Sequence, residues 1–496
     1  MKRGLLLLVL LLLVPTVVTG ACNITDDTVI STSTSLAANE TPCSVTDANS
    51  DGAIIINASD VALTCQNFQL SGNGTGYGIY SAKSGATIDS CDVTGYGNDV
   101  YFSSNYSSLI NSILAGTIKL SGGHAWVWNN TLGGVSISGG WYENNTIINN
   151  TINGGISISS QHAGTAPWFK IINNTITMST YKGKAIDATS ATPVANAEIS
   201  GNKITASSGL SYCIRLYGTY NTIKDNTMDC NFKGISFFKQ STNYNTIMNN
   251  VMTGGYLAFD FVNSHYNNIT SNNVTDFSNA MAFASGAANN LFWNNYFYVS
   301  SAGTNSDNMF NITKTAGTNI IGGNWTAGNW WWNYLGDDTD GDNIGDTELP
   351  HYNDYAPIII APIAFENCNM NFSTLDIDAG RLYNFTNCNL TFGTVNVKKY
   401  GKLYIQDSVV DAESGTWNLN SQTGSAVKIR DSTLNNCSIS SGSDLVLLTG
   451  NTINSGVAVS ITNSPKATIK TNTFTGSSKK IYLSGSSNAD ISGNVL

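Results

Sequence analysis

The chain has few charged side chains and little that favours helix. Only 11% of its 496 residues are Asp, Glu, Lys or Arg, and the formal net charge is −10. A nucleic-acid-binding protein needs a basic surface, so this composition argues against DNA or RNA as a partner. It also argues against tight binding of a polyanionic polysaccharide. No long stretch places apolar residues at the i, i+3, i+4 and i+7 positions of an amphipathic helix.

The sequence also lacks the spacings that mark zinc and redox sites. Its nine cysteines include no C-x-x-C, so neither kind of site has support. A second long apolar run is absent as well. The first one, at residues 5–14, follows Lys2 and Arg3, which is typical of a secretory signal peptide over residues 1–21. We therefore expect a secreted or cell-surface chain whose mature part has no transmembrane segment.

In place of these patterns, a six-residue phrase recurs from end to end: an apolar residue, two variable residues, usually Asn, a small polar residue and a second apolar residue. It is clearest at 223–228, 247–252, 269–274 and 291–296. Further copies lie at 88–93, 127–132, 147–152, 171–176, 199–204, 365–370, 385–390, 405–410, 429–434, 448–453, 469–474 and 491–496. A period of about 19 to 25 residues is too long for one strand and too short for a domain, and it fits one turn of a solenoid.

These turns predict an all-β fold, a right-handed parallel β-helix with turns of roughly 20–25 residues. Runs rich in Ile, Val, Thr and aromatic residues would form its faces, and Gly, Asn, Ser and Asp its corners. Equivalent side chains of successive turns should stack about 4.8 Å apart. In the fourth slot of the phrase we expect a structural row of stacked amides at left-handed corner positions. The row comprises Asn130, Asn150, Asn174, Asn202, Asn226, Asn250, Asn272 and Asn294.

The phrase is interrupted once, and the interruption divides the chain. We predict a main β-helix over residues 22–324, a Trp- and Asp-rich inserted loop over 325–362, and a further β-helix segment over 363–496. The last segment either continues the first helix or forms a second one. It stops inside a phrase, which would leave strand edges and apolar core uncovered. We therefore expect either a truncated C-terminus or a cap supplied by another subunit.

A family resemblance rests on phrases of the first turns. Residues 53–57 read AIIIN, residues 61–65 read VALTC and residues 76–80 read GYGIY. They resemble the opening turns of exported β-helix proteins with NosD-like repeats, many of them archaeal. Residues 325–358, with a Trp/Tyr cluster, an Asp-rich loop and a Tyr-x-Pro ending, are similar to a segment that interrupts or ends many such proteins.

The resemblance implies a surface or periplasmic solenoid, grouped with carbohydrate-binding and sugar-hydrolase β-helices of the pectate-lyase-like kind. Such repeats specify a fold better than an activity. The NosD name also suggests copper, which prefers grouped His, Met or Cys ligands. The four His residues are scattered, however, and Met228 and Met252 occupy an apolar slot of the phrase. We therefore predict no copper site.

The Asp-rich part of the insertion has the spacing of a calcium loop. Side-chain ligands would come from positions 1, 3, 5 and 9, and a backbone carbonyl from position 7. The candidate ligands are Asp338, Asp340, Asp342, Asp346 and, through its carbonyl, Ile344. Four carboxylates this close repel one another unless a cation lies among them. Asn343 replaces the usual Gly of position 6 and Leu349 the acid of position 12, so a solvated acidic loop is the alternative to a structural calcium site.

Trp330, Trp331 and Trp332 precede this loop and allow two interpretations. Flat aromatic faces stack on pyranose rings, so the cluster is a candidate carbohydrate-binding site. Alternatively, the three indoles fill the side of the solenoid and anchor the insertion by burying apolar area. The sequence favours anchoring.

Cys368 and Cys388 occupy the same slot of consecutive phrases. On neighbouring turns their Cα atoms would lie within the range that a disulfide allows. Stacked free thiols would fit equally well, because a buried Cys behaves as a small apolar side chain. The same alternatives apply to Cys65 and Cys91.

These observations favour an exported, mainly non-catalytic β-helix. Its partners would be a polysaccharide, a surface glycan or neighbouring surface proteins, and calcium would be its structural cofactor. The alternative is a polysaccharide lyase or glycoside hydrolase, which needs clustered acids, or calcium with a catalytic Arg or Lys. Arg215, Asp229 and Lys239 could share a groove. No paired-acid motif and no Gly-His-Gly appears, so we assign no catalytic residue.

Overall fold

The computed structural model describes most of the chain. The described residues are 17–18, 22–39, 41–139, 144–160, 169–189, 193–238, 242–303, 307–334, 336, 338–346, 353–359, 363–378, 380–454, 459–464, 466–475, 481–486 and 488–496. The regular elements in these ranges are β-strands, paired in parallel with one antiparallel exception. In this part of the chain no helix is long and apolar enough to cross a membrane. Of the predicted signal peptide only β1 (Val17–Val18) is described, so that assignment stays a prediction.

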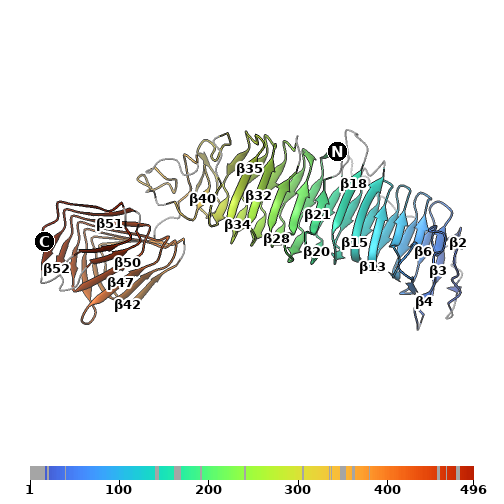
Figure 1. The fold of residues 1–496 in the computed structure, drawn as a ribbon, viewed down its shortest axis with the longest axis horizontal. Coiled ribbons are helices and arrows are strands. Elements are labelled where there is room, and N and C mark those ends of the chain that lie inside the picture. Colours follow the sequence, from blue (N-terminus) through green and yellow to red (C-terminus); the bar gives the residue numbers. More distant parts are fainter. Residues whose placement is uncertain are drawn as a thin grey trace. The chain divides into compact units, whose positions relative to one another are not determined.

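The strands divide into two compact units, Met1–Phe310 and Asn311–Leu496. Within each unit, successive strands stack rung upon rung (Figure 1). This arrangement is a right-handed parallel β-solenoid, which confirms the predicted fold class.

The first unit has three faces. Face 1 is a sheet of 13 described strands: β1, β3 (Thr34–Leu36), β6 (Ala62–Thr64), β9 (Thr87–Asp89), β12 (Ser108–Ile110), β14 (Trp126–Trp128), β16 (Thr146–Ile148), β19 (Lys170–Ile172), β23 (Glu198–Ser200), β27 (Thr222–Lys224), β30 (Thr246–Met248), β33 (Asn268–Thr270) and β36 (Leu291–Trp293). Face 2 comprises β4 (Cys43–Ser44), β7 (Gln69–Ser71), β10 (Asp92–Thr94), β17 (Thr151–Ile152), β20 (Thr175–Met178), β24 (Lys203–Ala206), β28 (Thr227–Cys230), β31 (Val251–Thr253), β34 (Asn273–Thr275) and β37 (Tyr296–Tyr298).

Face 3 comprises β2 (Thr28–Ile30), β5 (Ile54–Ile56), β8 (Tyr77–Ser81), β11 (Asn98–Phe102), β18 (Ile156–Ser160), β21 (Lys184–Ala188), β25 (Tyr212–Leu216), β29 (Lys233–Phe237), β32 (Leu257–Val262) and β35 (Asn279–Ala284). The longer strands β13 (Ile113–Leu120) and β15 (Thr131–Gly139) run through faces 2 and 3. β22 (Val194–Ala195) and β26 (Gly218–Thr219) form a separate two-stranded parallel sheet.

Alternation along each strand separates core from surface. In face 1 the middle residue of a strand points inward, as Ile223 and Ile247 do with 0% exposure, while Thr222 and Lys224 face outward. Parallel pairing in register, such as Ile223 on Ile247, stacks these apolar side chains into one continuous core. The outer residues are free of packing demands, so any binding function has to be sought among them or in the loops.

The predicted row of amides is a buried hydrogen-bonded ladder. The side chain of Asn226 donates through Nδ2 to the carbonyl of Ile199 (2.9 Å) and to Oδ1 of Asn250 (2.9 Å). Its backbone N–H also donates to Asn250 Oδ1, at 3.1 Å. The left-handed conformation expected at these positions lies one residue earlier, at Asp225 (φ 56°) and Asn249 (φ 56°). Asn is therefore favoured at the ladder positions because its amide forms hydrogen bonds with buried polar groups at the corner. Its tolerance of a left-handed backbone is not the reason.

In the last turn of this unit the repeat lies one residue later than predicted. Phe292, rather than Leu291, pairs with Ile269. Asn295 accordingly takes the ladder position and accepts from Asn272 at 2.9 Å, whereas Asn294 occupies the left-handed corner (φ 57°). Apolar residues at both 291 and 292 made the two registers equally compatible with the phrase.

A second ladder runs parallel to the first, five residues ahead of it. The side chain of Asn221 donates to Oδ1 of Asn245 (2.9 Å), and Asn245 donates to Asn267 (2.9 Å). Asn267 continues to Asn290 (2.8 Å), and Asn290 to Asn308 (2.8 Å). The sequence analysis missed this ladder, although the spacing N-x₄-N at 221–226, 245–250 and 267–272 carries its signal.

The second unit contains its own solenoid. Face 4 is a seven-stranded sheet of β41 (Ile363–Glu366), β43 (Leu382–Thr386), β45 (Lys402–Gln406), β48 (Ala426–Arg430), β51 (Leu445–Thr449), β54 (Lys466–Lys470) and β57 (Asp490–Ser492). Face 5 comprises β42 (Asn369–Ile377), β44 (Asn389–Val397), β46 (Val409–Ala412), β47 (Trp417–Ser421), β49 (Thr433–Asn435), β50 (Cys437–Ser441), β52 (Thr452–Asn454), β53 (Val459–Thr462), β55 (Thr473–Thr475) and β56 (Ile481–Ser484).

The segment before this solenoid belongs to the same unit. The unit boundary falls after Phe310, not at the predicted residue 324. An antiparallel pair, β38 (Thr315–Ala316) with β39 (Trp325–Thr326), and the short β40 (Trp330–Trp331) precede the Asp-rich loop. Trp332 meets Tyr400 edge to face, with ring centroids 6.3 Å apart. Lys402 Nζ donates to the carbonyl of Tyr334 at 2.5 Å, so the segment packs onto face 4.

Candidate functional site

The Asp-rich loop is folded around one carboxylate. Asp338 accepts the backbone N–H groups of Gly341 (2.7 Å), Asp342 (3.1 Å) and Asn343 (2.6 Å). Gly341 (φ 80°) and Asn343 (φ 69°) adopt left-handed conformations that let the chain curl around this side chain. Beyond the curl, Ile344 is buried (5% exposed). It bridges to Ile358, which ties the loop down.

Three of the predicted calcium ligands converge. Carboxylate oxygens of Asp338, Asp340 and Asp346 lie within 4.8 Å of one another. Asp346 is positioned by the backbone N–H of Thr339 (2.9 Å) and by its hydroxyl (2.7 Å), both of which donate to Oδ2. Hard oxygen ligands at this separation match the donor set that calcium prefers.

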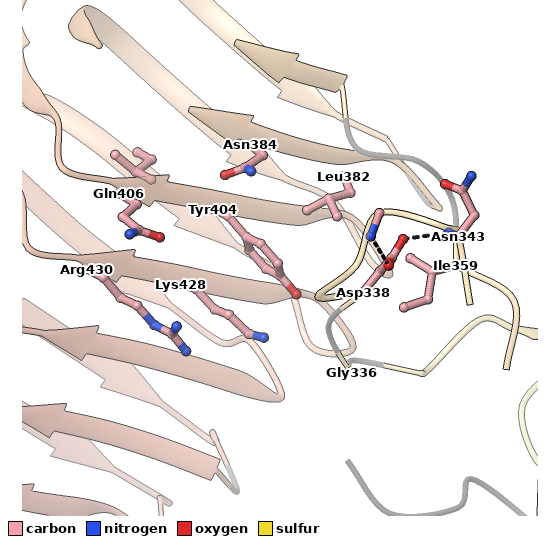
Figure 2. Close-up of a pocket in the computed structure, with 12 residues that line it drawn as sticks. Gly336, Asp338, Asn343, Ile359, Leu382, Asn384, Tyr404, Gln406, Lys428 and Arg430 are labelled. Carbon is pink, nitrogen blue, oxygen red and sulfur yellow. Dashed lines mark hydrogen bonds between the residues drawn. The ribbon is translucent and has the colours of Figure 1, made fainter. Parts of the chain in front are cut away.

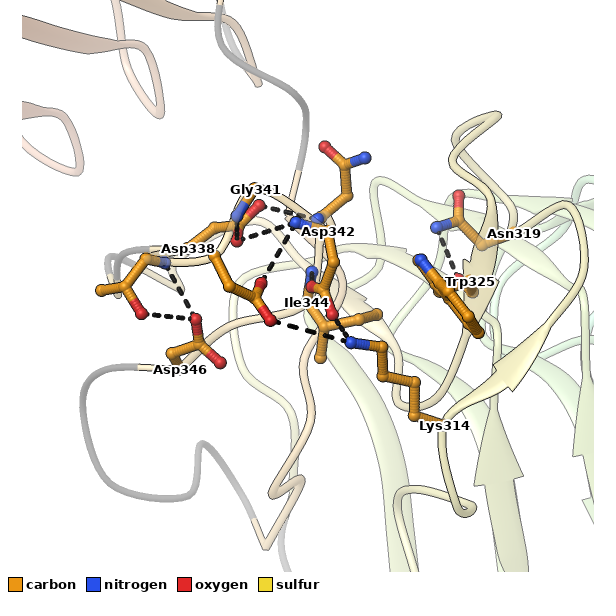
Figure 3. Close-up of polar contacts among 11 residues, drawn as sticks. Lys314, Asn319, Trp325, Asp338, Gly341, Asp342, Ile344 and Asp346 are labelled. Carbon is orange, nitrogen blue, oxygen red and sulfur yellow. Dashed lines mark hydrogen bonds and ion pairs between the residues drawn. The ribbon is translucent and has the colours of Figure 1, made fainter.

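The fourth predicted side chain faces a lysine instead. Lys314 forms an ion pair with Asp342, and its Nζ lies 3.9 Å from Oδ2 of Asp340 (Figure 3). The lysine is itself held over the ring of Trp325, 5.0 Å from the centroid. No sequence pattern near the loop pointed to Lys314, because it lies 24 residues before the first aspartate of the loop.

The local environment moves the pKa values of two of these acids in opposite directions. Burial raises the pKa of Asp338, although the backbone donors of Asn343 and Gly341 counteract it. Hydrogen bonds from Thr339 lower the pKa of Asp346. A nearby cation would therefore stabilise the ionised form of Asp338 most, because positive charge would offset the cost of its desolvation.

The three predicted sugar-stacking indoles are buried. Trp330, Trp331 and Trp332 are 5%, 1% and 4% exposed, which leaves no flat face for a pyranose ring. Trp331 donates through Nε1 to the fully buried carboxylate of Asp354 at 2.9 Å. This corrects the carbohydrate-binding interpretation of the cluster, because the indoles pack and anchor the segment onto the solenoid.

A pocket of about 510 Å³ lies between the loop and face 4, within the second unit. Below it is called the loop pocket. Its loop side includes Asp338 and Asn343, and its solenoid side is made by outward residues of three adjacent strands (Figure 2). These are Asn384 of β43, Tyr404 and Gln406 of β45, and Lys428 and Arg430 of β48. Strand register stacks them in two rows, Asn384–Tyr404–Lys428 and Gln406–Arg430.

The solenoid side of the loop pocket is cationic and rich in donors. The Lys428 ammonium lies 4.6 Å from the ring centroid of Tyr404, and the residue is only 8% exposed. The Arg430 guanidinium has no ion pair with any residue that the structure describes, and it keeps its donors for the pocket. Among those residues Asp338 is the only acid that lines the pocket. The sequence analysis missed this site, because the phrase marks inward positions and says nothing about which outward side chains a distant loop will cover.

Cysteine pairs occur in both units. The structure joins Cys368 to Cys388 and Cys65 to Cys91. It also joins Cys22 to Cys43 and Cys213 to Cys230, pairs that the sequence analysis did not consider. Cys437 is buried and belongs to none of these four disulfides.

Two of the residues considered for catalysis lie on different faces. Arg215 lies on β25 of face 3 and Asp229 on β28 of face 2, while Lys239 lies outside the described residues. Arg215 stacks on Phe238, with Cζ 3.6 Å from the ring centroid. On the same face, Asp260 is paired with Lys233 at 2.7 Å.

Comparison with known proteins identifies one family. Residues 206–336, about a quarter of the chain, match the model of NosD, described as a periplasmic copper-binding protein. No curated protein matches the chain. The match and the solenoid together fit a NosD-like parallel β-helix, as the opening phrases implied. The periplasmic character of that family supports an extracytoplasmic location, whereas an archaeal type stays a prediction.

The copper binding named for that family does not fit the donor groups described in this chain. His124 stacks on Tyr106, with centroids 4.6 Å apart, and His265 contacts Asn263 at 3.0 Å. Met252 is fully buried in the core. In the described ranges, three or more His, Cys, Asp or Glu side chains gather only at Asp338, Asp340 and Asp346, and hard carboxylates are poor ligands for copper.

Proposed function

We propose that the chain is an exported β-helix module that binds glycans outside the cytoplasm and holds calcium in the Asp338–Asp346 loop. The observation that carries this proposal is the loop pocket, in which an acidic loop faces a cationic, amide-bearing solenoid wall. Pockets with a few convergent polar groups on a rigid scaffold are typical of small-ligand sites. The NosD-like fold and the periplasmic character of that family support the location.

Calcium would act on the loop first. The carboxylates of Asp338, Asp340 and Asp346 repel one another within 4.8 Å, and a divalent cation removes that repulsion. Calcium takes about six to eight oxygen ligands. Three carboxylates therefore leave positions for carbonyls, water or ligand hydroxyls. The fourth carboxylate, Asp342, is paired with Lys314, so lysine and metal compete for it.

The opposite wall suggests the class of sugar. Arg430 and Lys428 supply positive charge, and Asn384 and Gln406 supply amides. Calcium in the loop would offset most of the charge of its three converging carboxylates, so the cationic solenoid wall would set the preference, which favours one sugar residue bearing a carboxylate. That carboxylate would face Arg430, and the sugar hydroxyls would face the amides. The net charge of −10 still argues against a long polyanionic chain as the ligand.

The test is a screen of the secreted protein against neutral and uronate-containing polysaccharides, with calcium and with chelator. We expect retention without cleavage, weakened by chelator, and measured by affinity electrophoresis. Reducing or unsaturated ends are assayed in the same samples. Their release would overturn the non-catalytic assignment and favour a lyase or hydrolase.

A matched pair of variants assigns the retention to the loop pocket. Arg430→Ala should weaken it about tenfold or more, the usual loss when a charge-assisted hydrogen bond is removed. Arg381→Ala removes an exposed arginine of the same unit that does not line the pocket, and it should leave retention unchanged. Equal effects of the two variants, or no effect of Arg430→Ala, would contradict the assignment. Neither retention nor cleavage would leave a structural surface protein.

A further inference from the structure

A pair of exposed tryptophans lies on the outer side of face 1, in the first unit. Trp126 and Trp128 are 45% and 37% exposed, while Val127 between them is fully buried. The two indoles therefore project from the same outer surface of β14, about 7 Å apart along the strand. Neither indole nitrogen donates to any residue that the structure describes. Trp293, also outward on this face, instead donates to Asn268 at 3.0 Å.

The neighbouring turns extend this surface. Strand register places Ile110 and Ile148 on either side of Trp128, and Ser108 and Thr146 on either side of Trp126. Each tryptophan thus lies in a row of its own: the Trp128 row is apolar, and the Trp126 row carries hydroxyl groups. The spacing of the rows follows from the sheet, so the surface is rigid before any ligand arrives.

Amide and aromatic groups border the two rows. At the corner after β14, Asn129 donates through Nδ2 to Asn111 at 2.8 Å, and both side chains are exposed. At the corner before β14, the rings of Tyr106 and His124 stack with centroids 4.6 Å apart and an interplanar angle of 16°. Tyr106 is 60% exposed. The surface formed by these residues is called the Trp126/Trp128 platform.

We propose that the Trp126/Trp128 platform binds a neutral polysaccharide. The C–H bonds on one side of a pyranose ring carry partial positive charge, and they pack against the negative face of an indole. Hydroxyls at the sugar's edge then meet Ser108, Thr146 and the Asn129–Asn111 amides. Nothing in the platform carries a fixed formal charge, which matches an uncharged ligand. The two indoles on one strand could each stack on one sugar residue of an extended polysaccharide that lies on the sheet.

The exposed area argues against a stable protein partner. From their exposed fractions, Trp126, Trp128 and Tyr106 together present on the order of 300 Å². A stable protein–protein interface buries about 800 Å² on each side. A single polysaccharide chain needs much less, because a few stacked rings supply most of its contacts.

This inference does not depend on the loop pocket, which lies in the other unit. The test uses the full secreted chain with chelator present. If the calcium-dependent binding of the proposed function fails, the result for the platform therefore still stands. Native gels containing hydroxyethyl cellulose, galactomannan or amylopectin serve as probes. We expect at least one of these neutral polymers to retard the protein.

Variants test whether the platform causes the retardation. Trp126→Ala and Trp128→Ala together should weaken it more than tenfold, and Trp128→Phe should retain part of it, because a smaller aromatic face remains. Tyr181→Ala, which removes a tyrosine outside the platform that is 63% exposed, is the matched control and should change nothing. Unchanged circular dichroism and thermal midpoints would separate lost binding from lost folding.

A measurement on the unaltered protein is independent of any folding defect. Bound polymer should slow oxidation of Trp126 and Trp128 by N-bromosuccinimide, as read by peptide mass spectrometry. It should not protect Tyr181 from iodination. No retardation by any of the three polymers, or retardation that the double variant leaves intact, would overturn the proposal. So would a concentration-dependent dimer that the double variant abolishes, because the platform would then join two copies of the chain.

Discussion

The indole Nε1 of Trp331 donates a 2.9 Å hydrogen bond to the carboxylate of Asp354, and both side chains are buried. Asp354 also accepts the backbone N–H groups of Asn329 (2.7 Å) and Ala356 (3.2 Å). The side-chain amide of Asn329 donates to it as well, at 3.2 Å, so one acid gathers four donors of the segment that carries the Asp-rich loop. This buried network joins the two ends of the segment on either side of the loop.

The stability of the second unit should fall as the pH rises through neutrality. Burial raises the pKa of Asp354 to about 7, whereas an unfolded Asp titrates near 4. The folded state then binds the extra proton, so this contribution is complete below about pH 4 and is lost as the pH rises through 7. We expect a decrease in the free energy of unfolding on the order of 2–4 kcal/mol. Urea denaturation between pH 5 and 8 measures it.

Asp354→Asn should flatten that pH profile, since the amide does not titrate. Asp411→Asn, at an exposed position of face 5, is the control and should retain the slope. A slope that survives Asp354→Asn would assign the pH dependence to another group.

Calcium should raise the thermal midpoint of the second unit. Removing two of the three converging acids in Asp338→Asn with Asp346→Asn should abolish the shift, because too few charged oxygen ligands remain. Titration calorimetry with calcium, repeated after chelator, measures binding directly. Asp407→Asn, also exposed in this unit, should bind calcium as the unaltered chain does. A thermal midpoint that calcium does not change would favour the solvated acidic loop.

Lys314→Met should tighten calcium binding. The lysine is paired with Asp342, so its removal frees a fourth carboxylate for the metal. The methionine keeps an unbranched apolar stem that still covers Trp325. We expect an increase of several-fold in affinity, worth about 1 kcal/mol. Weaker binding in this variant would instead mean that Lys314 positions the loop.

Removing one amide from the ladder should destabilise the first unit strongly. Asn226→Ala deletes three donated hydrogen bonds and leaves buried groups of two neighbouring turns unsatisfied. A loss of about 2–4 kcal/mol is expected. Asn249→Ala, at the exposed corner position one residue before a ladder asparagine, should cost about 1 kcal/mol or less. Chemical denaturation of both variants compares them.

Thiol counting should find one reactive cysteine per denatured, unreduced chain. Four disulfides account for eight of the nine cysteines, and Cys437 belongs to none of them. After reduction, all nine should react. A larger count before reduction, located by peptide mapping, would identify the turns in which stacked thiols stand in place of a disulfide.

Periodicity made the solenoid predictable from the sequence, since each turn repeats the same inward residues. It also located the ladder, but the reason for Asn there came from burial, which a sequence does not display. The one-residue error at Asn294 arose where two adjacent asparagines and two adjacent apolar residues fit both registers. The aspartates at 338–346 were found because calcium ligands alternate in sequence.

The rest depends on contacts between residues far apart in the chain. Lys314 reaches Asp342 across the β38–β39 pair, and Arg430 meets the loop only because the segment folds back onto face 4. Trp126 and Trp128 flank an inward valine, so their exposure does follow from strand alternation. The sequence analysis passed over them because the Trp cluster at 330–332 was more conspicuous.

The amide ladder fixes where each turn passes but not how long it is. Successive asparagines of the first ladder are 28 residues apart at Asn174–Asn202 and 20 apart at Asn130–Asn150, with the same hydrogen bonds. The turns can therefore gain or lose about eight residues while the ladder stays in place. Surface loops of this solenoid can diversify in evolution independently of its core, and new binding sites can arise on old turns.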